Sequence, residues 1–278
     1  MIKSKTDYLR GALIAGLILV ALVWTLFPLY YLFLTSVKSS KILFQTPPTL
    51  IAQPTLETYR VMYVERGFYK FFANSFIVAS GTVVVTLTIA SFASFGFTQW
   101  RFKGKEIVFF GSLIGRMFAP VTTLVPIYLM LKYVRLLDNE IGLILVHSAF
   151  SLPLAIIILR DFFSQVPKDL TESAFIDGAS SLQVLRKIVL PLSGNGLVAA
   201  GLLCFVESWN EFLFALVLTS LKAKTAPVVL ATLADTEGQI QWGALSALGV
   251  GTVLPTVLVM VFLGRFLIRG LTLGAVKG

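Results

Sequence analysis

Long apolar segments alternate with short polar ones along the whole chain. Crossing a hydrocarbon core of about 30 Å takes roughly 20 helical residues, and six apolar segments reach that length. They lie near residues 11–37, 71–98, 107–131, 141–163, 194–220 and 242–268. The pattern predicts an all-α, polytopic membrane protein with six transmembrane helices, organised as a single transmembrane domain over residues 1–278.

The overall composition supports a membrane protein. Apolar residues make up 56% of the 278 residues and charged residues 13%, with a mean hydropathy of +0.86. Soluble domains carry about 25% charged residues. The lone Cys204 and the lone His147 exclude a disulfide framework and leave no zinc site, so both are interpreted as packing residues. The net charge of +9 does not indicate nucleic-acid binding, because the basic residues are scattered between apolar segments.

The distribution of basic residues predicts the orientation. With a cytoplasmic N-terminus, thirteen Lys and Arg residues fall on the cytoplasmic side and nine on the outer side. Positive residues favour the cytoplasmic side of a membrane protein. Both termini are therefore expected in the cytoplasm, together with the polar stretch Thr171–Pro191.

The stretch Thr171–Pro191 predicts two short helices separated at Gly178. The first covers Glu172–Asp177 and the second Leu182–Leu190, with Ser180 or Ser181 as the N-cap of the second helix. Pro191 is expected to end it. The apolar positions of the second helix are expected to share one face. They are Leu182, Leu185, Ile188 and Val189.

This stretch resembles the coupling loop of the membrane-spanning subunits of ABC importers. The family pattern reads EAA…G…I-LP, and the matching residues are Glu172, Ser173 (in place of the usual Ala), Ala174, Gly178, Ile188, Leu190 and Pro191. Further matches resemble the carbohydrate-uptake branch of these permeases. They are residues 116–120, 126–128, 152–153 and 209–214. The end of the chain, residues 270–278, is similar to the tail of the shorter, MalG-like permease of maltose-type importers.

The resemblance implies a type I ABC importer permease fold in the bacterial cytoplasmic (inner) membrane. It implies that loop 167–191 docks on an ATPase through Glu172, Ser173, Ala174, Asp177, Gly178 and Ala179. The tail 269–278 would contact the ATPases through Gly274, Val276 and Lys277. The implied partners are a second, homologous permease, two ATPase subunits, an extracytoplasmic substrate-binding protein and the lipid bilayer. ATP and magnesium would sit on the ATPases, and this chain would bind no cofactor and catalyse no reaction.

Three charged residues fall inside predicted spans, where an unpaired charge is costly. They are Arg116, Glu207 and Glu211. The two glutamates are four residues apart, so a continuous helix would place them on one face beside Asn210. One hypothesis places these polar residues on the translocation path, with Trp209 stacking on a sugar ring. The alternatives are that either glutamate pairs with Arg116 to hold helices together, or that the carboxylates relay protons.

Further features of the sequence concern helix shape and contacts. Pro120 and Pro126 are expected to interrupt the third span. Gly111 and Gly115 form a G-x-x-x-G pattern, and Ala247 and Gly251 a similar pair of small residues. These pairs predict close helix contacts, either within the subunit or across a dimer.

The leading functional hypothesis is a permease subunit of an ATP-driven sugar importer. A polyol or a sugar phosphate is the nearest alternative cargo. A stand-alone ion-coupled transporter is the alternative from another class, and the loop Thr171–Pro191 argues against it. No metal cluster or nucleophile–base arrangement in the sequence points to an enzyme.

Overall fold

The computed structural model describes the backbone of residues 5–39, 42–43, 45, 49, 51, 53–233 and 242–275. Side chains are described for those of these residues that lie between 11 and 264, except residue 12. Every regular element in this part of the chain is helical, which agrees with the all-α prediction. Four helices are long and apolar enough to cross a membrane: Leu13–Val37, Tyr69–Gln99, Glu140–Ser164 and Trp242–Gly264. The number rises to six if each of two bent helix pairs is one span.

The two bent pairs differ from the straight spans that the sequence predicted. The third span consists of α4 (Lys105–Met117) and α5 (Pro120–Tyr133), which meet at 97°. The break comes just before Pro120, whereas Pro126 lies inside α5. The fifth span was expected over residues 194–220, but the bent pair is Ser181–Leu192 with α10 (Gly194–Trp209), at 82°. After α10 the chain breaks and continues as the short α11 (Leu213–Leu218).

The chain divides into two compact units, so the single-domain organisation stays a prediction. Unit 1 comprises residues 1–69 and 230–253. It contains α1 (Lys5–Val37), α2 (Glu57–Tyr59), the π-helix η1 (Arg60–Glu65) and the first part of α13 (Trp242–Ala275). The Tyr63 hydroxyl donates to the Ala247 backbone oxygen at 3.4 Å. Burial, helped by nearby Tyr59, raises the pKa of Tyr63 to about 12, so this donor stays protonated.

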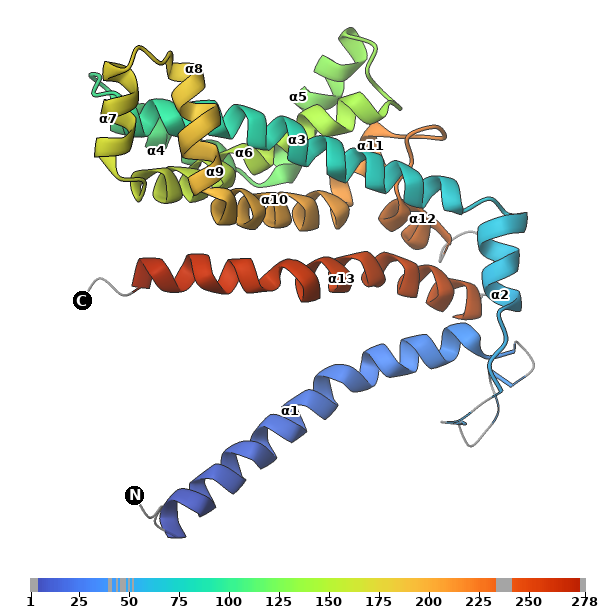
Figure 1. Ribbon diagram of the computed structural model, residues 1–278. Coiled ribbons are helices and arrows are strands. Elements are labelled where there is room, and N and C mark those ends of the chain that lie inside the picture. The colour runs from blue at the N-terminus through green and yellow to red at the C-terminus, as the bar shows by residue number, and fades with distance from the viewer. Residues whose placement is uncertain are drawn as a thin grey trace. The chain divides into compact units, whose positions relative to one another are not determined.

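Unit 2 comprises residues 70–229 and 254–278 and contains α3 (Tyr69–Gln99), α4, α5, α6 (Glu140–Ser164), α7 (Lys168–Ile176), α8 (Ser181–Val184), α10 and α11. In Figure 1, α7 and α8 lie at one end of this unit, and α5 and α11 lie away from that end. One buried cluster joins the ends of α3 and α6 to the loop after α7, through Phe97, Leu159 and Val184 among others. A second cluster joins α5, α6 and α11 through Leu131, Leu143 and Phe214.

A carboxylate joins the two loops at the predicted outer face of unit 2. Asp138, between α5 and α6, accepts hydrogen bonds from the backbone N–H groups of residues 220–223 and from the Ser220 hydroxyl, at 3.0–3.3 Å. Partial burial acts to raise the pKa of Asp138, but these backbone donors outweigh it and hold the pKa well below its usual range. The connection between α5 and α6 is thus fixed to the segment after α11.

The two pairs of small residues lie in different surroundings. A Cβ atom built on Gly111 or Gly115 would meet no atom of the other described residues within 4 Å, the backbone of its own helix aside. Their G-x-x-x-G pattern therefore makes no close contact within the described part of the subunit, and the alternative of a contact across a dimer stays a prediction. Ala247 is fully buried in unit 1, in keeping with a packed position.

Candidate functional site

The first half of the predicted coupling loop is a short helix with a well-formed end. Helix α7 runs Lys168–Ile176, and Gly178 follows it with a φ of +83°. The N–H of Ala179 donates to the Ala174 oxygen at 2.9 Å, and the N–H of Gly178 to the Phe175 oxygen at 3.1 Å. These two bonds form a Schellman motif, whose left-handed position favours glycine. The predicted break at Gly178 is confirmed.

The second half of the loop differs in detail from the prediction. Ser180, one of the two proposed caps, forms a reciprocal capping box with Gln183 and starts α8. The helix then continues as a π-helix, η2 (Leu185–Val189), and as α9 (Leu190–Leu192), so Pro191 does not end it. Pro191 is the second residue of α9.

The buried face of this segment also differs from the predicted one. Val184, Leu185 and Val189 are buried, whereas Leu182 is 59% exposed. The prediction of one shared face for Leu182, Leu185, Ile188 and Val189 was therefore wrong at Leu182, because Val184 packs against the core in its place. The buried side chains fix the loop to the cluster at the ends of α3 and α6.

The predicted docking residues form an exposed surface at the tip of the loop. Glu172, Ser173, Asp177 and Gly178 are exposed, and Ala174 and Ala179 are half-buried. Large apolar side chains next to them are also exposed, notably Ile176 at 85% and Leu182. A rigid, capped helix pair with exposed apolar side chains has the form of a protein-docking element. In the predicted tail, Gly274 lies within α13, whereas Val276 and Lys277 lie outside the described residues.

The predicted path residues contribute to a polar site within unit 2. Arg116, at the end of α4, forms a 2.8 Å ion pair with Glu207 of α10. The Ser151 hydroxyl donates to the other carboxylate oxygen of Glu207 at 3.0 Å, and Arg116 donates to the Phe150 oxygen at 3.3 Å. Both charged side chains are 37% exposed. The structure thus contains the pairing of Glu207 with Arg116 that the sequence offered as one alternative.

Glu211 lies past the end of α10, so it does not share a continuous helical face with Glu207. Its carboxylate accepts from the N–H groups of Phe214 and Ala215, at 2.8 and 3.0 Å, and so caps the start of α11. His147 Nε2 lies 3.2 Å from the same carboxylate.

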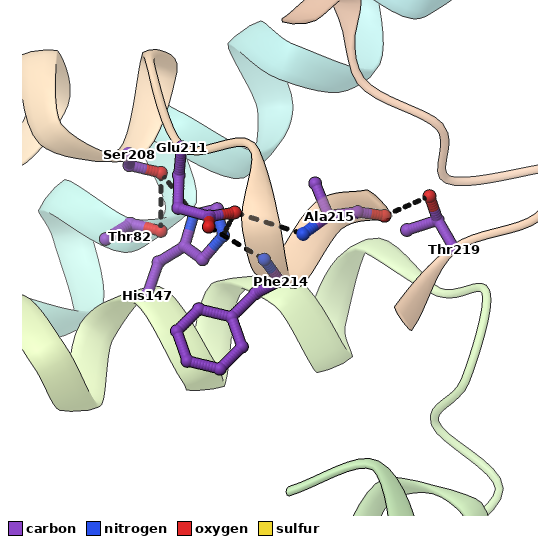
Figure 2. A network of polar contacts seen from close by, with 7 residues as sticks. All are labelled: Thr82, His147, Ser208, Glu211, Phe214, Ala215 and Thr219. Carbon is purple, nitrogen blue, oxygen red and sulfur yellow. Dashed lines mark hydrogen bonds and ion pairs between the residues drawn. The ribbon is translucent and has the colours of Figure 1, made fainter. Parts of the chain in front are cut away.

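The contacts of His147 continue into the interior (Figure 2). Its Nδ1 lies 2.7 Å from the Ser208 hydroxyl, which in turn lies 3.3 Å from the hydroxyl of Thr82 on α3. His147 and Ser208 are buried. One polar network therefore connects α3, α6, α10 and α11 through Thr82, Ser208, His147 and Glu211.

A cavity of about 170 Å³ lies between these groups. Glu207, Ser151, His147, Ser208 and Glu211 line it together with apolar side chains. Typical small-molecule sites measure about 300–1,000 Å³. In this conformation the cavity has room for only part of a sugar, but it offers both hydrogen-bond donors and acceptors.

The other predicted path residues, Arg116, Trp209 and Asn210, do not line this cavity. Trp209 is 3% exposed and stacks on Phe205, with ring centres 5.8 Å apart. Asn210 is exposed, and its side-chain amide donates to the Val206 oxygen at 2.8 Å. In this conformation Trp209 is a packing residue, and Asn210 ends α10.

Sequence reasoning missed several members of the site. His147 was interpreted as a packing residue, although it is a hydrogen-bonded member of the network. Ser151 and Ser208 were not considered. One signal was present, since His147 and Ser151 stand one turn apart in an otherwise apolar segment and predict a polar stripe on α6.

Comparison with known proteins identifies the family. The family model described as "Binding-protein-dependent transport system inner membrane component" matches residues 87–272. The chain belongs to this family. It is therefore a multi-pass inner membrane component, and the resemblance to ABC importer permeases is confirmed.

Curated relatives match this inner membrane component over nearly its full length. The trehalose/maltose transport system permease protein MalG of Thermococcus litoralis is 34% identical over 97% of each chain. The inner membrane ABC transporter permease protein YcjP of Escherichia coli is 32% identical over 100% of each. The diacetylchitobiose uptake system permease protein DasC of Streptomyces coelicolor is 31% identical over 93% of this chain and 94% of its own.

A solved structure shows the same fold. One chain of a bacterial ABC transporter involved in the import of the acidic polysaccharide alginate superposes on this protein with a TM-score of 0.82. The two chains are 22% identical in sequence, and the match covers 95% of this protein and 99% of the alginate transporter chain. The predicted all-α, polytopic type I permease fold is thereby confirmed.

Proposed function

We propose that this inner membrane component is a permease subunit of an ATP-driven importer of a sugar or oligosaccharide. Its partners would be a second permease, two ATPase subunits that bind ATP and magnesium, and an extracytoplasmic substrate-binding protein. Support for the cargo comes from the relatives, whose names refer to trehalose, maltose and diacetylchitobiose. The chain itself would hold no cofactor and perform no catalysis.

The observation that carries the coupling role is the loop around Gly178. Its Schellman motif fixes the angle between α7 and α8, and the buried residues Val184, Leu185 and Val189 attach it to the ends of α3 and α6. A push on the exposed tip would therefore reach the membrane helices as a rigid displacement rather than being lost in a flexible loop. With the predicted orientation, this tip faces the cytoplasm, where ATPases bind.

Transport would follow alternating access between inward-open and outward-open states. ATP binding can shift that equilibrium only by its differential affinity for the two states. The breaks before Pro120 and after Trp209 are places where helices can change their relative angles. Arg116, Glu207 and Glu211 border these breaks, which favours a role for them beside the path.

The test uses the four-component complex reconstituted in vesicles with its binding protein. Gly178→Asp, which forces a non-glycine residue into a left-handed position at the tip, should reduce substrate-stimulated ATP hydrolysis to the unstimulated rate. Gly104→Asp is the matched control, because Gly104 has a φ of +82° and equally open surroundings. Stimulation that survives in Gly178→Asp would contradict the coupling role. A ligand screen of the binding protein separates sugar from polyol and sugar-phosphate cargo.

A further inference from the structure

A second cavity lies beside the coupling loop, away from the polar site just described. It measures about 890 Å³ and lies where the ends of α3 and α6 meet the starts of α4 and α7. Lys168, Thr171 and Glu172 of α7 form part of its wall. Anything bound there would therefore touch the same helix that carries the proposed docking residues.

Basic side chains dominate the charged lining of this cavity. The cations are Arg101, Lys105, Arg160 and Lys168, and the carboxylates in the same lining are those of Asp161 and Glu172. Arg160 is already engaged, because it forms a two-pronged pair with Glu106 at 2.9 and 3.5 Å and stacks over the Phe109 ring at 4.1 Å. The other three cations form no ion pair within the described ranges. Three cations are thus without an ion pair, and with the carboxylates of Asp161 and Glu172 the lining keeps a net positive charge that an anion can balance.

The surroundings of the cavity are those of a membrane interface. Its inner wall includes the buried rings of Phe97, Phe109 and Phe163. Trp100 and Phe102, on either side of Arg101, are each 47% exposed. The adjoining α4 exposes Ile107 at 78%. Aromatic side chains at the level of the headgroups, beside an apolar helix surface, are typical of the boundary between water and lipid.

We infer that this cavity binds the phosphate headgroup of an anionic phospholipid, with Arg101, Lys105 and Lys168 around the phosphate. Basic pockets at the ends of transmembrane helices suit such headgroups. A soluble phosphate has the same charge, but the exposed apolar surface of α4 next to the cavity favours a ligand with acyl chains. The lipid would then connect the bilayer to α7 directly.

The test is retention of defined lipids by the purified full-length chain, measured by native mass spectrometry. Phosphatidylglycerol should be retained over phosphatidylcholine. Because one basic side chain near an anionic surface contributes about 1 kcal/mol, Lys105→Gln should weaken phosphatidylglycerol retention about fivefold. The triple change of Arg101, Lys105 and Lys168 to Gln should weaken it about a hundredfold. Lys103→Gln is the control, since it removes the same charge from the same loop but does not line the cavity.

Several results would overturn the inference. Equal losses in Lys103→Gln and Lys105→Gln would mean general attraction to surface charge. Protection of Lys105 from amine-reactive labelling by inorganic phosphate, without selective lipid retention, would assign the site to a soluble anion. Protection of Lys105 by the ATPases in pure phosphatidylcholine nanodiscs would assign it to a protein partner. The lipid assay needs neither ATP nor the other subunits, so its failure is distinct from failure of the proposed function.

Discussion

Replacing Glu211 with alanine should destabilise the protein as well as affect transport. The change removes the carboxylate that caps α11 and the partner of His147 Nε2. Loss of a helix cap costs about 1 kcal/mol, and a buried polar group left without a partner costs about 1–3 kcal/mol. The combined loss is about 3 kcal/mol, which corresponds to a fall in Tm of roughly 6–10 °C for a chain of this size.

The assay is thermal unfolding of the full-length chain in lipid nanodiscs, followed by tryptophan fluorescence. Glu65→Ala is the control, because this exposed carboxylate forms a 3.6 Å ion pair with the exposed Arg60, and its Tm should stay close to that of the parent protein. The double change of His147 and Glu211 to alanine should cost less than the two single changes added together, because each removes the same contact. A Glu211→Ala chain with unchanged Tm but lost uptake would refute this reasoning and would make Glu211 a path residue.

Two further predictions concern the predicted outer face and the packing of α6. Asp138→Asn should destabilise the chain at neutral pH, because the ionised carboxylate gains stability from its backbone donors. Since folding lowers the pKa of Asp138, the difference in Tm between variant and parent should be constant above about pH 5. The difference should narrow as the pH falls below about 4. A difference that does not change with pH would contradict this. Gly142→Ala should lower the Tm by an amount equivalent to about 1–3 kcal/mol, because the added methyl group would clash with the backbone oxygen of Leu136. Gly111→Ala should leave the Tm unchanged, because the space beside Gly111 is open. Equal Tm shifts in the two variants would refute the packing argument.

Local chemistry explains why the loop around Gly178 was predictable. A left-handed glycine, a serine cap and a change from apolar to polar residues act over a few neighbouring residues, so the break and the cap could be read directly. The exposed position of Leu182 could not, because burial in this segment depends on which distant helices pack against it. The tertiary packing of Val184 in place of Leu182 decided that register.

The sequence by itself determined the membrane class, the helical architecture and the position of the helix break at Gly178. Long apolar segments favour transmembrane α-helices, because a helix forms all its backbone hydrogen bonds internally and a bilayer core supplies no water to replace them. Only the tertiary structure decided which charges meet. Arg116 and Glu207 are 91 positions apart in the sequence and lie on different helices. Glu211 caps α11 only because α10 ends at Trp209. Such pairings depend on how helices bend and pack, and those contacts between distant segments leave no local pattern to read.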